Sequence, residues 1–559
     1  MAACGAVLSA ANKPPIKLHV TIPMRDGIRL SANVFLPGDH EHSRLPVILE
    51  RTPYIKAPDI TPNYQSFVDH GYAVVVEDVR GRNESGGAFD PLRQEPADGD
   101  DTLNWIARQP WSDGKVGMIG GSYRGIVQWK AALVNNPHLK AIFPVVSGYD
   151  DYRDRYYSTG GALKLGHRLE WMAENQRAPG YHPDFSKFIL HLPLRTADIA
   201  ATGWSLAMYR DVMAHPSYDS FWRALSVKEQ IQKIRVPVFA VGGWYDNYAE
   251  SDLEAYTELH KTSGLNHVLI GPWPHNMSYR FDNVDFGPDS GVPLRSIQLA
   301  WFDQWLMGKD NPIVSQPPVQ IFVMGANYWR EDHEWPPADA RPKKFFLESD
   351  GRANTLDGDG ALDEKTPRGS EDRYVFDPRD PVPTRGGAVC CNPKVFAWGP
   401  MDQRTVEQRR DVLVYTTKPL KQDMEVVGPV QAILYISTSA KDTDFTAKLV
   451  DVAPDGSARN LTDGILRLRY RNGLEKAELA KPGAVYQITV DAGVTANVFL
   501  KGHRIRLEIS SSNFPRFDRN PNTGGVIADA VQLQRANQTL FHDHDHPSHL
   551  LLMVTPGRG

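Results

Sequence analysis

The residues best suited to carry out a chemical reaction surround Ser122. Residues 115–125 read KVGMIGGSYRG, so an apolar strand runs into glycines, a serine and the start of a helix. A sharp strand-to-helix turn of this kind exposes the serine hydroxyl beside a helix N-terminus. The pattern predicts that Ser122 is a nucleophile. The usual turn is Gly-x-Ser-x-Gly, and Arg124 stands here at the second glycine position, so its side chain must point away from the strand–helix contact.

Two later segments supply the base and the acid that a serine nucleophile needs. A serine hydroxyl is a weak nucleophile, so a histidine must take its proton and a carboxylate must orient that histidine. A strand over residues 238–242 leads to Asp246, and the next strand, over residues 268–270, leads to His275. Each signal alone is weak, because an aspartate after a strand often caps a helix. The order Ser122, Asp246, His275 is that of the α/β-hydrolases.

An oxyanion formed at Ser122 requires two hydrogen-bond donors. The backbone N–H of Tyr123, directly after the nucleophile, is the first. The second is expected from the loop after the strand at 46–50, where Tyr54 stands. From the residues alone, Tyr54 is either a phenol donor or a surface aromatic in a proline-bounded loop, and the second interpretation is favoured.

The surrounding patterns predict a parallel sheet that is covered on both faces. A hairpin is expected over residues 17–37, with its turn at 25–27. Short apolar strands alternate with helices, and the helix near residues 250–261 is followed by one that contains Trp301, Phe302 and Trp305. The expected strands are 46–50, 72–77, 115–119, 141–146, 236–242 and 266–270, and the earlier helices are 100–108 and 126–135.

Two other stretches differ from the core in composition and hydrophobic pattern, and they indicate further domains. Residues 149–235 are rich in aromatic residues, arginine and histidine, with helical periods, which indicates an inserted helical cap. After residue 336, turns rich in glycine and aspartate separate alternating strands, which is typical of a β-sandwich. The predicted fold class is therefore α/β, with an α/β-hydrolase core at 1–148 and 236–336, the cap at 149–235 and a β-sandwich at 337–559.

Composition excludes several classes of protein. The chain of 559 residues has a net charge of −5, without the basic surplus of a nucleic-acid binder. No apolar run is long enough to span a membrane, so no membrane partner is expected. The N-terminus has no basic leader, and the three cysteines, Cys4, Cys390 and Cys391, imply no disulfide framework. A cytoplasmic location is expected, with secretion left open, and the oligomeric state is also open, a homo-oligomer included.

Histidines near the C-terminus are the candidates for a metal site. Residues 541–549 read FHDHDHPSH, and histidines at i and i+2 of an extended segment share a face. A solvated turn before the last apolar strand is the favoured interpretation. Asp444 and Phe445 could suggest a second active site, but a turn residue and a core aromatic of a β-strand explain them. Neither a metal nor an organic cofactor is expected.

Taken together, these segments resemble the cocaine esterase / X-Pro dipeptidyl peptidase family of serine hydrolases. The family's serine motif is Gly-x-Ser-Tyr-x-Gly, which residues 120–125 match, so Arg124 is no longer anomalous. The resemblance spans nearly the whole chain. It is carried by residues 24–27 (MRDG), 51–54 (RTPY), 78–81 (DVRG), 85–86 (SG), 120–125 (GGSYRG), 244–246 (WYD), 271–275 (GPWPH), 437–438 (ST), 442–445 (DTDF), 451–456 (DVAPDG) and 510–515 (SSSNFP).

The resemblance implies roles for these residues. Ser122 would be the nucleophile, His275 the base and Asp246 the group that orients it. Tyr54 would donate its hydroxyl to the oxyanion, beside the amide of Tyr123. The C-terminal domain would be jelly-roll-like, the cap would follow the sixth strand of the sheet, and the acyl pocket would lie between the domains.

Three aromatic residues match the pocket lining of the esterase members by position. They are Tyr156 and Trp171 in the cap and Tyr248 after the predicted acid. Packing in the core of the cap explains them equally well, so both interpretations stay open.

The predicted function is hydrolysis of carboxylic esters of small molecules through an acyl-enzyme. Within the family, an acylase or an X-Pro dipeptidyl-peptidase type of amide hydrolase is the main rival, although the chain is short for the latter. Members that hydrolyse α-amino acid esters resemble one another in a carboxylate cluster. Here Arg155 or Tyr156 takes the expected acidic position, which disfavours that activity, although Asp150, Asp151 and Asp154 are nearby. A non-catalytic binding protein on the same scaffold is a further alternative, which the complete Ser–Asp–His set opposes.

Overall fold

The structure is a computed structural model that describes residues 13–38, 43–176, 181, 184–282, 284–369, 371–390 and 397–557. The chain divides into two compact units. The first comprises Met1–Val145, Lys233–Phe239 and Pro293–Gln316, and the second comprises Val146–Gln232, Ala240–Val292 and Pro317–Gly559. Within the described ranges, every helix falls short of the length and hydrophobicity that a membrane span requires.

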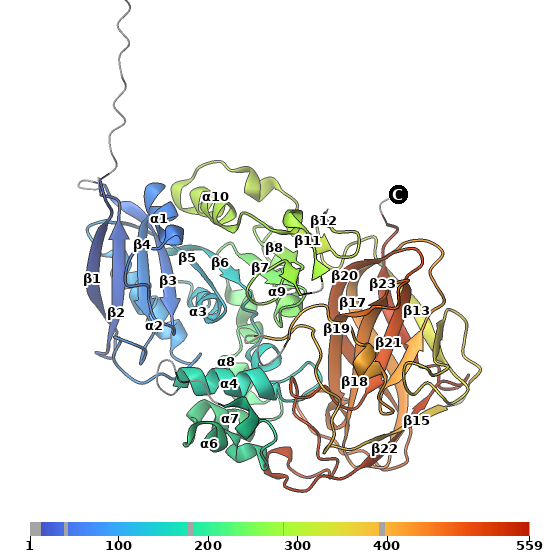
Figure 1. Cartoon of the computed structure of the whole chain (residues 1–559). Helices are drawn as coiled ribbons and strands as arrows, with labels where there is room; N and C mark the ends of the chain where they lie inside the picture. The colour runs from blue at the N-terminus through green and yellow to red at the C-terminus, as the bar shows by residue number, and fades with distance from the viewer. Residues whose placement is uncertain are drawn as a thin grey trace, which may run out of the picture. The chain divides into compact units, whose positions relative to one another are not determined.

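The first unit is built on a sheet with the strand order β1-β2-β4-β3-β5-β6 (Figure 1). β1 (Ile16–Pro23) and β2 (Arg29–Leu36) form the predicted hairpin, whose turn passes through Gly27 at a φ of +84°. β2 pairs antiparallel with β4, and the remaining neighbours are parallel. These strands are β3 (Leu45–Thr52), β4 (Ala73–Asp78), β5 (Ser112–Gly121) and β6 (Leu139–Val145), as the apolar runs predicted.

Helices of the first unit contact one another in two pairs. α2 (Glu95–Ala107) packs on α3 (Tyr123–Ala132), and α1 (Pro62–Asp69) packs on α10 (Leu294–Met307). Trp301 and Phe302 of α10 are buried, and their rings contact Phe239 and Phe143 respectively. The aromatic side chains of α10 therefore pack into the core of the unit.

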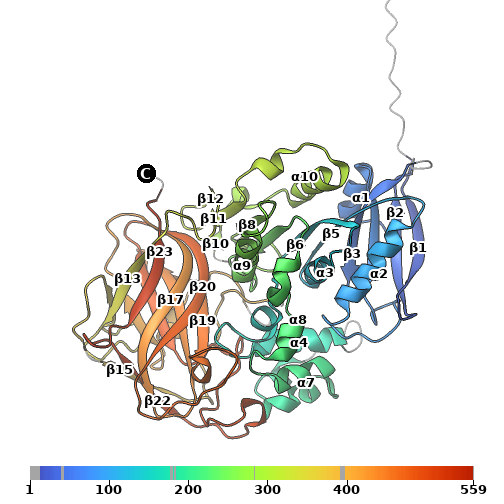
Figure 2. The same cartoon turned by 180° about the vertical axis from the view of Figure 1, so that it is seen from behind.

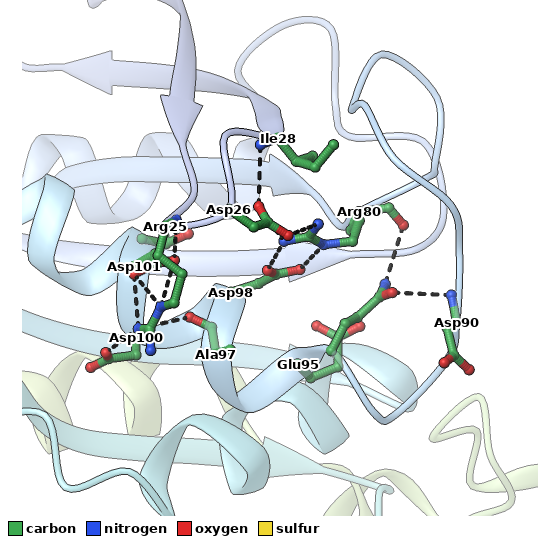
Figure 3. A network of polar contacts seen from close by, with 12 residues as sticks. Arg25, Asp26, Ile28, Arg80, Asp90, Glu95, Ala97, Asp98, Asp100 and Asp101 are labelled. Atoms are coloured by element: carbon green, nitrogen blue, oxygen red, sulfur yellow. Dashed lines mark hydrogen bonds and ion pairs between the residues drawn. The ribbon is translucent and has the colours of Figure 1, made fainter.

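Arginine–aspartate pairs join the β1–β2 turn to α2 (Figure 3). Arg80 lies between Asp26 of the turn and Asp98 of α2, with N–O distances of 2.6 Å to each carboxylate. Arg25 pairs with Asp100 of the same helix at 2.5 Å. The motifs at residues 24–27 and 78–81 therefore have a structural role, because they fix the hairpin against the helix.

The segment between β6 and β7 is helical, as predicted. It begins with a turn of π-helix at Asp151–Tyr156, and its described residues form isolated bridges but no strand. Trp222 is buried beneath Tyr152 and Tyr156. The helices are α4 (Leu165–Gln176), α5 (Phe185–Phe188), α6 (Ala197–Thr202), α7 (Ala207–Ala214) and α8 (Ser220–Leu225).

Further strands follow in the order β7-β8-β11-β12. β7 (Phe239–Gly243) leads to α9 (Ala249–His260), and β8 (His267–Gly271) pairs parallel with β11 (Val319–Val323). β12 (Tyr328–Asp332) is antiparallel to β11. The predicted strand–helix–strand unit that carries Asp246 and His275 is therefore present.

The C-terminal part of the second unit is the predicted β-sandwich (Figures 1 and 2). Its strand order is β15-β22-β17-β23-β13-β14-β16-β21-β18-β19, and β20 pairs along β17. The strands are β13 (Arg341–Glu348), β14 (Ala361–Asp363), β15 (Glu371–Phe376), β16 (Leu413–Thr416), β17 (Met424–Thr438), β18 (Asp444–Val452), β19 (Ala458–Arg467), β20 (Tyr486–Phe499), β21 (Arg504–Ser510), β22 (Ala536–Phe541) and β23 (His549–Val554).

Cys390 departs from the sequence expectation. It is disulfide-bonded, and its partner lies outside the described residues. The sequence analysis implied no disulfide framework and did not anticipate this bond. Spacing along the chain does not report which sulfur atoms meet in the fold, which is the condition a disulfide has to satisfy.

Candidate active site

Ser122 occupies a strained turn between β5 and α3. Its backbone has a φ of 59° and a ψ of −128°, a conformation that residues with a side chain rarely adopt. Its N–H donates to the carbonyl of Val145 at 2.9 Å, and its own carbonyl accepts from Gly125 at 2.8 Å as the helix begins. The half-buried serine therefore has the geometry of a nucleophile turn at the end of a parallel strand.

The departure at Arg124 is accommodated by Gly120. A Cβ on residue 120 would lie 2.5 Å from the Cβ of Arg124, and the φ of Gly120 is +130°. The Arg124 side chain turns toward β3, where Nη1 donates to Glu50 at 3.0 Å. Tyr64 donates to the same Glu50 oxygen at 2.8 Å. As predicted, the arginine points away from the turn.

A buried ionic network fixes the Tyr123 side chain. The Tyr123 hydroxyl donates to Glu95 at 2.9 Å and accepts from the N–H of Leu92 at 2.9 Å. Arg51 donates to Glu95 at 2.8 Å and to Glu77 at 2.6 Å, and all three charged side chains are fully buried. Burial raises the pKa of Glu77 and of Glu95, against the attraction of Arg51. The network holds the first residue of α3, whose amide lies outside the helix's own hydrogen-bond ladder.

The loop that carries Tyr54 is held by the aspartate of the 78–81 motif. Asp78 accepts from the Lys56 backbone at 2.9 Å, from the Lys56 ammonium at 2.8 Å and from Asn83 at 2.9 Å. Asn83 also donates to the Tyr54 carbonyl at 2.5 Å, and the Tyr54 N–H donates to Thr52 at 3.1 Å. Tyr54 is half-buried. Its backbone is thus held directly by Asn83 and Thr52, within a loop that Asp78 fixes.

Arg82 is a residue of this region that the sequence analysis missed. It is 8% exposed, and its Nε donates to the carbonyl of Pro53 at 2.7 Å. Burial lowers the pKa of Arg82, while nearby Asp78, Tyr123 and Tyr54 raise it. The Arg82 guanidinium therefore interacts with the side chains of both Tyr54 and Tyr123. Its only sequence signal is its place directly after the 78–81 motif.

Asp246 and His275 meet in the second unit as predicted. His275 Nδ1 lies 2.6 Å from an Asp246 carboxylate oxygen, and the other oxygen accepts from the N–H of Tyr248 at 3.1 Å. The carboxylate is fully buried, whereas 13% of the imidazole side chain is exposed. Because a carboxylate only accepts, Nδ1 carries the proton and Nε2 is the ring atom that can take another. This pair has the chemistry of a general base.

The predicted aromatic lining is only partly brought together. The Tyr248 ring centroid lies 6.0 Å from that of His275, and Tyr156 is buried against Trp222 at 5.5 Å. Tyr156 and Tyr248 also interact electrostatically. Trp171 is half-buried on α4. The burial of Tyr156 and Tyr248, 3% and 2% exposed, suits core packing as well as a pocket lining.

The three aspartates of the cap are already engaged. Asp151 pairs with Arg155 at 2.5 Å, and Asp150 pairs with Arg153 at 2.7 Å. Asp154 accepts from Ser251 at 2.6 Å and from the N–H of Asp150 at 2.7 Å. Burial raises the pKa of Asp154 to about 6. These carboxylates therefore serve the packing of the cap.

The C-terminal histidines do not share a face. His542 is fully buried, 2.9 Å from Asp372, whereas the His544 side chain is 88% exposed. His546 pairs with Asp543 at 3.0 Å. The histidines therefore form no common metal-binding face, and the segment is not a fully solvated turn, because His542 is buried in the sandwich core. Within the described ranges, no three potential ligands gather as a metal would require.

Comparisons with known proteins agree with this geometry. Residues 26–277 match the X-Pro dipeptidyl-peptidase (S15 family) model, and residues 311–551 match the X-Pro dipeptidyl-peptidase C-terminal non-catalytic domain. The cocaine esterase of Rhodococcus sp. (strain MB1 Bresler) is 38% identical, over 96% of this chain and 98% of that protein.

Two solved structures are similar over almost the whole chain. An aminopeptidase from a marine sediment Thaumarchaeota archaeon has a TM-score of 0.85 at 26% identity, with 99% of each chain covered. An α-amino acid ester hydrolase has a TM-score of 0.85 at 27% identity, with 99% of this chain and 98% of that chain covered. The chain therefore belongs to the cocaine esterase / X-Pro dipeptidyl-peptidase family of serine hydrolases, with an α/β-hydrolase core, a helical cap and a C-terminal β-domain.

Proposed function

We propose that the protein hydrolyses carboxylic esters of small molecules through an acyl-enzyme formed on Ser122. The observation that carries this proposal is the backbone of Ser122, whose φ of 59° presents a hydroxyl at the end of a buried strand. Strained backbone of this kind clusters at active sites, and a strand-to-helix turn is where α/β-hydrolases expose their nucleophile. Family membership supports the same chemistry, because the relatives with high coverage include named esterases.

In the proposed reaction, Ser122, Asp246 and His275 act as one triad. The Ser122 Oγ attacks the ester carbonyl carbon as His275 Nε2 takes its proton, and Asp246 stabilises the imidazolium. The tetrahedral oxyanion accepts hydrogen bonds from the Tyr123 N–H and the Tyr54 hydroxyl. The alcohol then leaves with the proton from His275. Water attacks the acyl-enzyme by the same route and releases the carboxylic acid, which restores Ser122.

A fluorophosphonate probe tests the nucleophile. We expect covalent labelling at Ser122 and no labelling of Ser122→Ala, whose turnover of 4-nitrophenyl esters should fall by several orders of magnitude. A folded Ser122→Ala protein that keeps wild-type turnover would refute the assignment. A protein that binds ester analogues without any labelling would instead be a binding module on a hydrolase scaffold.

A substrate panel separates ester from amide hydrolysis. Turnover of 4-nitrophenyl acyl esters, glutaryl anilides and X-Pro anilides is compared on the wild type and on Ser122→Ala. We expect the esters to be cleaved fastest. Cleavage of the X-Pro anilide alone would make the protein a dipeptidyl peptidase. Preference for an α-amino acid ester is not expected, because Asp150, Asp151 and Asp154 already have partners.

A further inference from the structure

The cap contains a buried guanidinium that pairs with none of the described carboxylates. Arg168 of α4 is 7% exposed, and its Nη2 donates to the Tyr248 hydroxyl at 2.9 Å and to the Asp154 carbonyl at 3.4 Å. Its Nε is buried and meets no acceptor among the described residues. No described carboxylate forms an ion pair with Arg168. Since arginine has five N–H donors, most of its capacity is unused.

Several other buried arginines of the chain are compensated by carboxylates. Arg51 pairs with Glu77 at 2.6 Å, and Arg467 pairs with Asp444 at 2.9 Å. A buried ion without an opposite charge loses its hydration and gains little in return, so such groups are normally paired. Arg168 departs from this pattern. Arg519 also lacks a described carboxylate partner and donates to the carbonyls of Pro378 and Leu190, but only Arg168 of these two has a buried N–H without an acceptor among the described residues. A negatively charged group from outside the chain would supply the missing partner.

The surroundings of Arg168 do not cancel its charge. Lys164 lies one turn earlier on the cap, and burial, together with repulsion by Arg168, lowers its pKa to about 7. Burial and the same cation hold the pKa of His167 well below its usual range. The nearby Asp154 carboxylate is committed to Ser251 at 2.6 Å. Lys164 and His167 are thus basic groups that cannot compensate the charge of Arg168.

Two contacts connect Arg168 with His275. The guanidinium carbon lies 5.8 Å from the centroid of the Tyr248 ring, and that centroid lies 6.0 Å from the His275 ring. Tyr248 is itself held by its N–H donating to Asp246. All four residues belong to the second unit. The unpaired cation is thus fixed one aromatic ring away from the proposed base.

We propose that Arg168 binds a carboxylate on the acyl part of the substrate, so that the enzyme prefers half-esters of dicarboxylic acids. This proposal rests on the proposed ester hydrolysis. The substrate carboxylate would accept charge-assisted hydrogen bonds from the unused Arg168 donors, and these are stronger than neutral ones. Tyr248 is then a positioning residue, because its hydroxyl fixes the guanidinium.

A matched pair of substrates tests the subsite. 4-Nitrophenyl hydrogen adipate and 4-nitrophenyl hexanoate have acyl chains of equal length and differ in the terminal carboxylate. We expect the wild-type kcat/KM to be about tenfold or more higher for the half-ester. Arg168→Gln should lose about 10- to 100-fold on the half-ester and less than about threefold on the hexanoate. Arg168→Lys keeps the charge, so its kcat/KM on the half-ester should lie between that of the wild type and that of Arg168→Gln.

Arg223→Gln is the control, because Arg223 is a cap arginine whose side chain is 47% exposed. The kcat/KM of this variant should equal that of the wild type on both substrates. Equal losses on both substrates in Arg168→Gln would overturn the subsite and make Arg168 a support for Tyr248. If the variants fail to fold, the wild-type ratio decides, and a ratio of one or less overturns the proposal. Hexanoate turnover that depends on Ser122 would leave the proposed function standing in either case.

Discussion

Gly120 is the position where the turn at Ser122 depends most directly on a missing side chain. In Gly120→Ala, the new Cβ would lie 2.5 Å from the Cβ of Arg124 and 3.3 Å from its carbonyl oxygen, at a φ of +130°. Backbone strain of about 1–3 kcal/mol and overpacking of a similar size should together lower the stability of the turn by about 2–6 kcal/mol. We also expect turnover to fall, because the clash displaces Arg124 in the first turn of α3, two residues after Ser122.

A second substitution separates the two causes. Arg124→Gly removes the side-chain atom that the new Cβ would meet, at a cost of about 1 kcal/mol in helix propensity and about 0–1 kcal/mol for the partly exposed pair with Glu50. The double variant should therefore be more stable than additivity predicts, by about 1–3 kcal/mol. Hydrogen exchange of peptides from β5 and α3 measures the local opening free energy. Additive effects within about 0.5 kcal/mol would refute the contact as the reason for glycine.

The remaining predictions concern the proposed triad, the oxyanion donor and the sandwich core. Asp246→Asn should lower kcat by about 10³–10⁴-fold with the structure intact, because the amide no longer fixes the tautomer of His275. Steady-state kinetics on 4-nitrophenyl butyrate measure this loss of kcat. Tyr54→Phe should cost about 10²–10³-fold in kcat, and a loss below about threefold would exclude its hydroxyl as an oxyanion donor. Burial opposes ionisation of Asp372, but hydrogen bonds from His542 and other neighbours hold its pKa below the usual value. Its stabilising contribution is therefore present above about pH 4 and lost as pH falls below it, so acid unfolding of Asp372→Asn should be less steep there than that of the wild type.

The parts of the fold that depend on local pattern were predictable. Apolar runs located β3 to β6, and the order of Ser122, Asp246 and His275 predicted the pairing at 2.6 Å. Element boundaries were less accurate. α2 begins at Glu95 rather than Asp100, because Pro96 is tolerated in the first turn of a helix.

Features that depend on partners distant in sequence were missed. No pattern in the sequence around Arg168 indicates that it lacks a described carboxylate partner. The fold decides which arginines meet a carboxylate, and those partners are often distant in sequence. The length of β17, from Met424 to Thr438, likewise depends on its partner strand, since the register shift after Pro429, with Gly428 at a φ of +143°, lets the strand continue through a bulge. The domain boundaries, the cytoplasmic location and the oligomeric state stay predictions.

The nucleophile and the base are positioned by different means, which has a consequence for specificity. The backbone conformation positions Ser122. The strained turn, Gly120 and a buried ionic network leave few tolerable substitutions there. Around His275 the neighbours are side chains such as Tyr248 and Arg168, which can change without moving the turn. Relatives with the same fold accordingly bear the names of an esterase, an aminopeptidase and an α-amino acid ester hydrolase. Substrate choice should therefore change with substitutions at Tyr248 and Arg168, whereas substitutions at the turn should abolish turnover of every substrate alike.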